Sequence, residues 1–307
     1  MQPLRFGFSC YPFSRFAGAD ALLQTYELLE TLGFHHAQIG EHFIVPAENA
    51  ATLDTVWYDG IALAATVLAR TKRLKVLFGV IVVPYRHPVH LAKSMATLDI
   101  LSGGRIIMGA GVGWAKREFE LLGIPFSERG ARTDDALRAV KALWASESPS
   151  YQGRFFSFDN VVFRPRPLTR PHPPIWIGGA ADKTIERAAE LGDGLHPLGG
   201  PLSRLEKMAA DTRLALEKRG RDPTTFSFSL TAEFGATVSH HAREAGASDF
   251  GLVIGPEMDR ALEQVEQYRR AGYSYVTIRT PHRDVSAIHD VLHRFHAEVM
   301  RPLSGER

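Results

Sequence analysis

Residues 74–110 read LKVLFGVIVVPYRHPVHLAKSMATLDILSGGRIIMGA, and this stretch decides the fold class. Its first ten letters, Leu74–Val83, are almost all Leu, Val, Ile and Phe, which predicts a strand buried on both faces. His90–Leu101 follows with helical apolar spacing, and Ser102-Gly103-Gly104 provides a stop. Arg105–Ala110 is the next apolar run. The order strand, helix, strand predicts parallel strands joined by a helical crossover.

The same alternation continues on both sides of this unit. Expected strands are Arg5–Ser9, Ala37–Gly40, Ile175–Gly178, Gly194–Leu198, Phe226–Glu233 and Tyr273–Ile278, and expected helices are Ala19–Leu32, Gly60–Ala69, Ala131–Trp144, Asp182–Leu191, Leu202–Arg219, Glu257–Ala271 and Val285–Met300. Eight strands, each followed by a helix, predict an α/β fold with a single (β/α)8 TIM barrel over residues 1–307. A doubly wound parallel sheet is the alternative that this rhythm allows.

Residues 145–174 interrupt the rhythm and are expected to be an insertion in the barrel. Tyr151–Phe163 has the pattern of a β-hairpin, with its turn expected at Asp159-Asn160. Five prolines between 165 and 174 then predict a stiff extended linker. Because strands and helices resume directly afterwards, this segment is no domain boundary. The segment 235–256 has no clear pattern.

Composition narrows the class of protein. The chain has 307 residues, a formal net charge of +2 and no long run of like charges, so neither a nucleic acid nor a membrane surface is an expected partner. Cys10 is the single cysteine, which favours a reducing compartment and excludes a metal site built on several thiolates of one chain. The first residues do not resemble a signal peptide, and a cytoplasmic location is expected. We also expect no metal, since no carboxylate can be placed beside two histidines.

In a barrel of this type the site is built from the loops that follow the strands. Glu41-His42 follows the second strand, and histidine exchanges protons near neutral pH, so this pair is the best acid–base candidate. The alternative is a histidine that only hydrogen-bonds a neighbouring loop. Cys10 follows the first strand and could be a nucleophile, but a small apolar filler is the simpler interpretation.

Glycine-rich loops follow the fourth and fifth strands: Gly109-Ala110-Gly111-Val112-Gly113-Trp114 and Gly178-Gly179-Ala180-Ala181. Glycines between a strand and a helix leave backbone N–H groups free, and a helix N-terminus favours an anion. Together the two loops could therefore bind one phosphate. Tight turns that need glycine without any ligand are the competing explanation.

Several of these segments, taken together, resemble one family. Leu98–Arg105 running into Gly109–Trp114 is similar to the most diagnostic stretch of the luciferase-like monooxygenases. Further segments of the same resemblance are Pro84–Pro88, Glu118–Gly123, Glu128–Gly130, Leu143-Trp144 and Pro173–Gly179. The resemblance is strong over roughly residues 5–200 and weak beyond them.

The resemblance implies a TIM barrel that binds FMN or the deazaflavin coenzyme F420 across its strand ends, with the phosphate in the two glycine loops. It implies His42 and Glu41 as catalytic residues. It implies a cofactor site made of Ser9, Glu41, His42, Ile81, Val82, Gly111, Gly113, Trp114, Gly178, Gly179, Ala180 and Ala181. Relatives carry a non-proline cis peptide in the third strand, which is expected at Ile81–Val82. Trp114 stands where deazaflavin-dependent dehydrogenases often carry a glutamate, so that acid is missing.

Three functions follow from this resemblance. The first is hydride transfer to or mono-oxygenation of a small organic substrate, with an F420-dependent reductase or dehydrogenase slightly favoured. The second is an FMNH2-dependent two-component monooxygenase similar to the alkanesulfonate enzymes, supplied with reduced cofactor by a separate reductase. The third is a non-catalytic flavin-binding homologue, since a fold does not by itself imply function. The resemblance also implies a homodimer.

Overall fold

In the computed structural model, the stretch 74–110 folds as the predicted βαβ unit. It contains β3 (Lys75–Phe78), β4 (Ile81–Val82), α3 (Pro88–Ser102) and β5 (Ile106–Gly111). His87 accepts a hydrogen bond from the Val89 amide at the start of α3, and Gly103 ends the helix in the left-handed conformation with φ of 70°. The structure describes residues 3–51, 53–197, 201–234, 252–254 and 258–304.

The parallel strands close into a barrel. Besides β3 and β5, the barrel strands are β1 (Arg5–Ser9), β2 (His36–Ile39), β8 (Ile175–Gly179), β9 (Gly194–Pro197), β10 (Ser227–Phe234) and β12 (Tyr275–Arg279). β10 pairs with β12 on one side and with β9 on the other, and β12 pairs with β1. This closure confirms the TIM barrel and excludes the open doubly wound sheet. β11 (Leu252–Ile254), which the sequence analysis did not predict, pairs with β10 as an extra strand.

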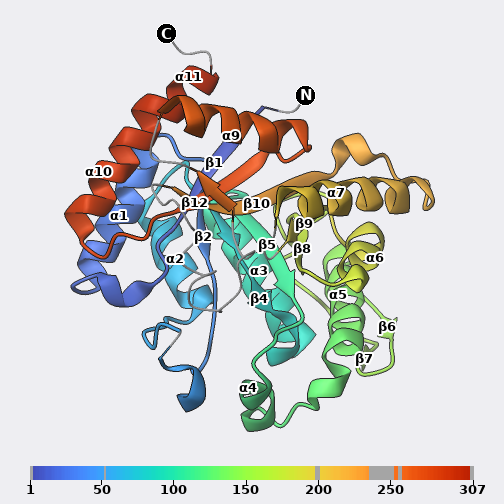
Figure 1. The fold of residues 1–307 in the computed structure, drawn as a ribbon. Helices are drawn as coiled ribbons and strands as arrows, with labels where there is room; N and C mark the ends of the chain where they lie inside the picture. Colours follow the sequence, from blue (N-terminus) through green and yellow to red (C-terminus); the bar gives the residue numbers. More distant parts are fainter. Residues whose placement is uncertain (1–2, 52, 198–200, 235–251, 255–257, 305–307) are drawn as a thin grey trace.

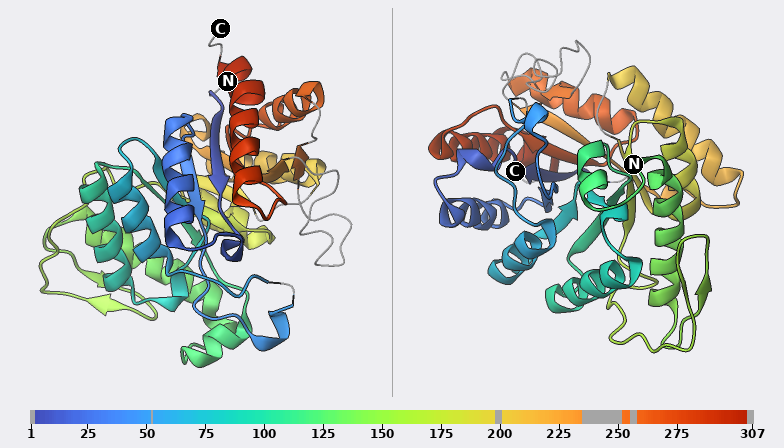
Figure 2. Two further views of the ribbon diagram at one scale, coloured as in Figure 1. Left: turned by 90° about the vertical axis from the view of Figure 1, so that its left-hand side faces the viewer. Right: turned by 90° about the horizontal axis from the view of Figure 1, so that it is seen from below.

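Helices surround the barrel (Figures 1 and 2). They are α1 (Ala19–Thr31), α2 (Gly60–Arg70), α3, α5 (Arg129–Ala145), α6 (Asp182–Leu191), α7 (Leu202–Glu217), α9 (Met258–Arg270) and α10 (Val285–Phe295), with a π-turn His296–Met300 and α11 (Arg301–Ser304) after it. Leu22, Tyr26 and Leu29 lie at helical spacing on α1 and are all buried, so one face of the helix packs on the barrel. α4 (Lys116–Leu121) and the loop after β2 lie at the end of the barrel opposite the chain termini (Figure 1).

The barrel interior contains both an apolar cluster and polar contacts. Leu77, Ile107 and Trp176 pack together with Tyr275. Alternate residues of a strand point to the same face, so Thr277 faces the same way as Tyr275, and its hydroxyl lies 2.8 Å from Nε2 of His36. Nδ1 of His196 contacts the hydroxyl of Ser229, which is in register with Tyr275.

Two buried histidines in this interior predict that the protein loses stability on mild acidification. Burial lowers the pKa of His196 to about 4, and it holds the pKa of His36 well below its ordinary value. An unfolded histidine takes up its proton near pH 6.5, so between about pH 6.5 and 4 the unfolded chain binds more protons. The contribution of these two histidines to the free energy of unfolding should therefore be constant above pH 6.5. Below pH 6.5 it should decrease as the pH is lowered.

The expected slope is about 1.4 kcal/mol per pH unit for each histidine. Urea unfolding at pH 7.5, 6.5, 5.5 and 4.5 measures it. In a His196→Asn variant the slope of unfolding free energy against pH should be smaller by the contribution of one histidine, about 1.4 kcal/mol per pH unit. An equal slope in the variant and the wild type would show that His196 does not carry this effect.

The insertion is a short hairpin whose turn lies earlier than predicted. β6 (Tyr151–Gln152) pairs with β7 (Ser157–Phe158), and the Gly153 amide donates to the Phe156 carbonyl at 2.9 Å. The expected turn at Asp159-Asn160 is therefore wrong. Asp135 of α5 explains the earlier turn. Its carboxylate accepts hydrogen bonds from the backbone amides of residues 154–156, at 3.3, 2.6 and 3.1 Å.

Asp135→Asn is expected to loosen this hairpin. The carboxylate also accepts from the Tyr151 hydroxyl at 2.6 Å, and although burial would raise the pKa of Asp135, these hydrogen bonds lower it below its ordinary value. Replacing a charged acceptor of four donors should cost about 1–2 kcal/mol of unfolding free energy, measured by thermal unfolding. Asp159→Asn, at an exposed position of the same insertion, is the matched control and should change stability by less than about 0.5 kcal/mol. Equal effects would contradict this anchoring role.

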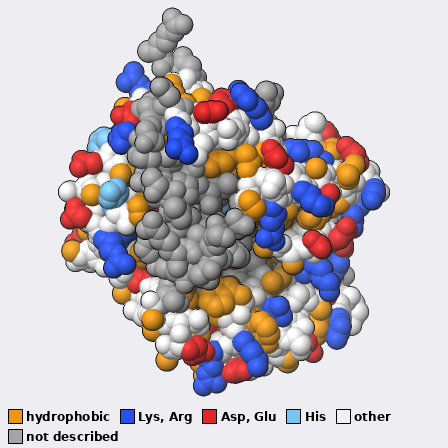
Figure 3. Space-filling view, in the orientation of Figure 1, with side chains coloured by type: hydrophobic (Ala, Val, Ile, Leu, Met, Phe, Trp, Pro, Cys, Tyr) orange, Lys and Arg blue, Asp and Glu red, His pale blue; other side chains and the backbone are white. Residues whose placement is uncertain are grey.

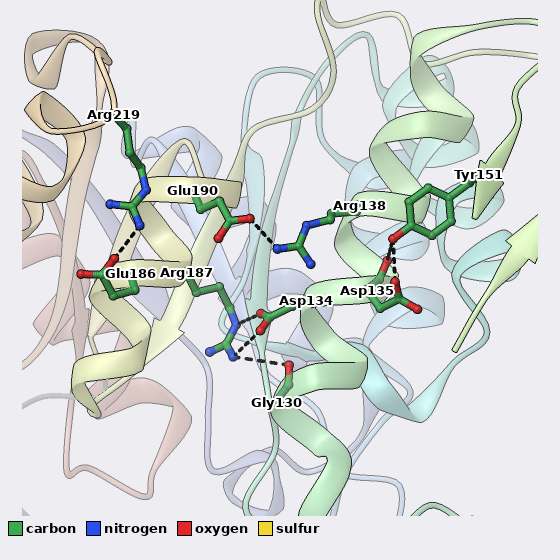
Figure 4. Close-up of polar contacts among 9 residues, drawn as sticks. All are labelled: Gly130, Asp134, Asp135, Arg138, Tyr151, Glu186, Arg187, Glu190 and Arg219. Atoms are coloured by element: carbon green, nitrogen blue, oxygen red, sulfur yellow. Dashed lines mark hydrogen bonds and ion pairs between the residues drawn. The ribbon is translucent and has the colours of Figure 1, made fainter. Parts of the chain in front are cut away.

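Ion pairs join neighbouring helices on the outside of the barrel (Figure 4). Arg187 of α6 binds Asp134 and the Gly130 carbonyl of α5, and Arg138 of α5 binds Glu190 of α6. Over the described part of the face in Figure 3, acidic and basic side chains are interspersed across α6 and α7. The charged residues of these helices therefore hold helices together and give them a mixed surface.

Candidate active site at the carboxyl end of the barrel

The third strand is interrupted where β3 ends and β4 begins. The non-proline cis peptide lies at Gly79–Val80, so the expected position, Ile81–Val82, is wrong. Ile81 and Val82 instead form β4 and pair with Ala110 and Gly111 of β5. Gly79 is the residue without a side chain in this bend, and a Cβ there would lie 2.6 Å from Cγ of Gln38. The bend therefore falls at the glycine, two residues before the predicted position.

This bend explains several glycines of the two loops. The Val80 side chain occupies the space that side chains at Gly111 and Gly178 would need, since a Cβ at either glycine would lie 2.4 or 2.5 Å from a Val80 methyl group. A Cβ at Gly109 would lie 1.7 Å from the Phe78 carbonyl oxygen. Close packing against the third strand is thus a sufficient reason for glycine at these three positions, with or without a ligand.

Glu41 follows β2 and is buried by a network of its own. Both oxygens accept from the Arg86 guanidinium, at 2.8 and 2.7 Å, and one also accepts from the Val82 amide at 2.7 Å. Burial raises the pKa of Glu41, although both guanidinium contacts oppose the shift. Its carboxylate is therefore committed to holding β4 and the following turn in place.

His42 lies beside two aromatic rings at the open end of the barrel. Its ring contacts Trp57 and Trp114 edge-on, with centroid distances of 4.8 and 5.4 Å. Its Nδ1 lies 2.8 Å from an oxygen of Glu118. Because a carboxylate only accepts, Nδ1 donates, and in the neutral ring this leaves Nε2 as an acceptor.

Glu118 is one of the site residues that the sequence does not single out, as are Trp57 and Arg204. It lies on α4, and its carboxylate accepts hydrogen bonds from four donors of the neighbouring loops: His42 Nδ1, the Tyr85 hydroxyl and the amides of Phe43 and Ile44. Burial would raise the pKa of Glu118, but the hydrogen bonds from His42 and Tyr85 outweigh it and lower that pKa. Glu118 is therefore an anion that joins the loops after β2, β4 and β5. Its burial in an otherwise largely exposed helix is visible only in the structure.

The loop after β8 leads into the start of α6. Gly179 has φ of 146°, and Ala181, the residue before the helix, offers no side chain to cap it. The Arg204 guanidinium, from α7, donates to the Ala180 carbonyl. Amide groups at the start of α6 and a guanidinium thus lie around this loop, a combination suited to an anion.

A cavity of about 470 Å³ opens at the carboxyl ends of β1, β10 and β12, and residues 50, 51 and 53–55 form part of its wall. Ser9 is buried at the end of β1, where its carbonyl accepts from Arg15. Within the described ranges, no group of three or more His, Cys, Asp or Glu side chains is placed to hold a metal ion.

The sequence of residues 12–250 matches the family model described as luciferase-like monooxygenase. The chain belongs to this family. Among its described residues, none of the helices has the length and apolar character needed to cross a bilayer.

This luciferase-like chain has relatives of known and unknown activity. It is 31% identical over 166 residues to an FMNH(2)-dependent dimethylsulfone monooxygenase of Pseudomonas putida, a match covering 53% of this chain and 46% of that protein. It is 33% identical over 199 residues to an uncharacterized protein of Mycobacterium tuberculosis (strain ATCC 25618 / H37Rv), covering 64% and 67%. The chain thus spans about half the length of the dimethylsulfone monooxygenases it matches.

Solved structures with the same fold include two oxidoreductases. A long-chain alkane monooxygenase superposes with a TM-score of 0.82 at 14% identity, covering 99% of this chain and 92% of that one. An F420-dependent secondary alcohol dehydrogenase superposes with a TM-score of 0.79 at 17% identity, covering 98% and 99%. At these identities the likeness concerns the barrel alone.

Proposed function

We propose that this protein binds a reduced flavin or deazaflavin at the carboxyl end of its barrel and uses it to reduce or mono-oxygenate a small organic substrate. The observation that carries the proposal is the His42–Glu118 pair, in which Nδ1 of His42 lies 2.8 Å from a carboxylate oxygen of Glu118. The His42 ring also contacts the rings of Trp57 and Trp114. A histidine with an oriented, carboxylate-bound Nδ1 is an acid–base group at a strand end, where barrel enzymes carry their chemistry.

The residues present fit such a cofactor. The uncapped start of α6, with Gly178, Gly179, Ala180 and Ala181 before it, would hold the phosphate, assisted by Arg204. The ring would lie against Val80 and the neighbouring Ile81, Val82, Gly111 and Gly113. Ser9, His42 and Trp114 would also contact the ring. Glu41 would hold β4 in place by accepting the hydrogen bond of the Val82 amide.

His42 is proposed as the catalytic residue. When bound, a reduced flavin or deazaflavin supplies the electron pair of the reaction. Nε2 of His42 would take a proton from, or return one to, the reacting atom of the substrate. Glu118 would keep Nδ1 protonated and stabilise the charged imidazolium, while Trp57 and Trp114 would limit the access of water to this nitrogen.

Reduced FMN is the first cofactor candidate, because the dimethylsulfone monooxygenase relatives are described as FMNH(2)-dependent. F420 is the second, because its oxidised form would accept the hydride of an alcohol whose hydroxyl proton Nε2 of His42 would take. With FMN we propose a separate reductase as the source of reduced cofactor. We further propose a homodimer in the cytoplasm.

Binding titrations test the proposal and separate its alternatives. The protein is titrated with FMN and with F420, each oxidised and reduced under anaerobic conditions. Tighter binding of reduced FMN supports the monooxygenase, and tighter binding of F420 supports the reductase or dehydrogenase. Binding of neither cofactor would overturn the proposal. Binding with no turnover of any substrate would leave a non-catalytic flavin-binding homologue.

A further inference from the structure

The Gln38 side chain points into the interior of the barrel. Its carboxamide oxygen accepts a hydrogen bond from the Thr231 hydroxyl at 3.1 Å. Gln38 lies on β2 and Thr231 on β10, and the strands β12 and β1 stand between them in the sheet. A side-chain contact between strands that are not neighbours passes through the inside of a barrel, so both side chains point inward.

The Gln38 carboxamide is open toward the carboxyl end of the barrel. Alternate residues of a strand share a face, so His36 and Gly40 are the neighbours of Gln38 on the inner face of β2. His36 is fully buried and covers the side toward the amino end, whereas Gly40 has no side chain. Gln38 itself is partly exposed. Its exposed part therefore faces the end of the barrel at which the site lies.

The same carboxamide lies against the bend between β3 and β4. A Cβ at Gly79 would lie 2.6, 2.7 and 2.9 Å from Cγ, Cδ and Nε2 of Gln38, so the amide group packs directly on the backbone of this glycine. Gly79 and Val80 are both partly exposed. Because the cofactor ring is proposed to lie against Val80, the Gln38 nitrogen lies at the edge of the ring site.

The amide nitrogen of Gln38 is available to a bound molecule. The Thr231 hydroxyl donates to the oxygen, which leaves the nitrogen on the side of Gly79. Over the part of the chain that the structure describes, no group accepts a hydrogen bond from this nitrogen. An amide nitrogen carries two N–H donors, so Gln38 presents an oriented donor to the site.

We propose that the Gln38 amide donates a hydrogen bond to the ring of the bound cofactor and favours its reduced form, an assignment that rests on the proposed function. Flavin and deazaflavin rings carry oxygen and nitrogen atoms that accept hydrogen bonds, and such bonds tune the electronics of the ring. A ring that has gained an electron pair carries more negative charge, and hydrogen bonds to a charged acceptor are about twice as strong. Thr231 is then a positioning residue, since it holds the amide oxygen.

Anaerobic titrations of Gln38→Glu and Gln38→Met with oxidised and reduced FMN and F420 test the proposal. Glutamate keeps the acceptor for the Thr231 hydroxyl and removes the amide donor, and methionine has a similar length and no N–H group. For the cofactor that the wild type prefers, each variant should lose at least about tenfold more affinity for the reduced form than for the oxidised form. This tenfold difference lowers the midpoint potential of the bound two-electron couple by about 30 mV, which a redox titration measures.

Two further variants complete the experiment. Thr231→Val keeps the shape of the side chain and removes its hydroxyl, so it should also weaken the reduced form more than the oxidised form. Gln24→Glu, an exposed change on α1, makes the same substitution elsewhere and should leave both affinities unchanged. An effect of Gln24→Glu equal to that of Gln38→Glu would overturn the proposal.

Equal losses for the two redox forms would assign Gln38 only the structural role of filling the space beside Gly79, and would overturn the proposal. Unchanged affinities combined with a raised KM for a substrate would overturn it too. Should neither Gln38 variant fold, the side-chain amide resonance of Gln38 in isotope-labelled wild-type protein decides, because it should shift more with reduced than with oxidised cofactor, and an equal or absent shift would refute the proposal. A wild type that binds neither cofactor defeats the proposed function itself. Gln38 variants that bind the cofactor as the wild type does defeat only the role of Gln38.

Discussion

Gly109→Ala is expected to prevent the barrel from closing normally. The added methyl carbon would lie 1.7 Å from the Phe78 carbonyl oxygen. The backbone of β5 fixes the position of this carbon, and the oxygen belongs to the backbone of the paired strand β3. No side-chain rotation can relieve such an overlap, so β3 and β5 would have to separate. We expect a loss of more than about 4 kcal/mol in the free energy of unfolding, measured by urea denaturation.

Gly130→Ala is the matched control for this substitution. Gly130 lies in the first turn of α5, where an added Cβ would meet only the Arg187 guanidinium at an ordinary 3.5 Å. Alanine favours a helix over glycine by up to about 1 kcal/mol, so this variant should be as stable as the wild type or slightly more so. A Gly109→Ala protein that unfolds like Gly130→Ala would contradict the close approach of the two strands.

His42→Gln should abolish most of the turnover while leaving cofactor binding intact. Glutamine can keep a hydrogen bond to Glu118, but it cannot exchange a proton near neutral pH, and general acid–base groups typically contribute about 10²–10⁴-fold to the rate. The measured quantity is kcat for a substrate that the cofactor-loaded protein converts. His90→Gln, at an exposed position of α3, is the control and should be unaffected.

Glu118→Gln should show whether the carboxylate acts through His42. The substitution takes from Nδ1 of His42 the carboxylate that orients the ring, so kcat should fall while the Kd of the cofactor stays unchanged. A purely structural role would weaken cofactor binding and lower kcat together. A similar turnover in wild type and His42→Gln would contradict the assignment of His42 itself.

Apolar runs and their spacing were enough to predict the barrel. Val, Leu and Ile in Leu74–Val83 make a strand buried on both faces, and the helices between the strands have complete apolar faces. Local features that depend on distant partners were placed wrongly. The hairpin turn is fixed by Asp135, and glycine is required at 79 because a Cβ there would overlap the Gln38 side chain. Neither contact is visible in the local pattern.

The candidate site was predicted only in part for the same reason. Position after a strand was sufficient to select His42. Glu118 lies 76 residues further along the chain, and only the closed barrel brings the two together. Arg15 is a similar case, since its partners Thr280 and His282 are 265 and 267 residues away. A charged residue is identified as a site residue by its burial and its partners, and both depend on the fold.

Histidine-labelled NMR of His42 tests the central claim most directly. The chain has 13 histidines, and the spectrum of His42→Gln identifies the resonances of that ring. We predict a ring that carries a proton on Nδ1, hydrogen-bonded to Glu118, with an Nε2 resonance that shifts when the preferred reduced cofactor is added. An Nδ1 without a proton in the free protein, or a His42 spectrum unchanged by saturating FMN and F420, would contradict the account.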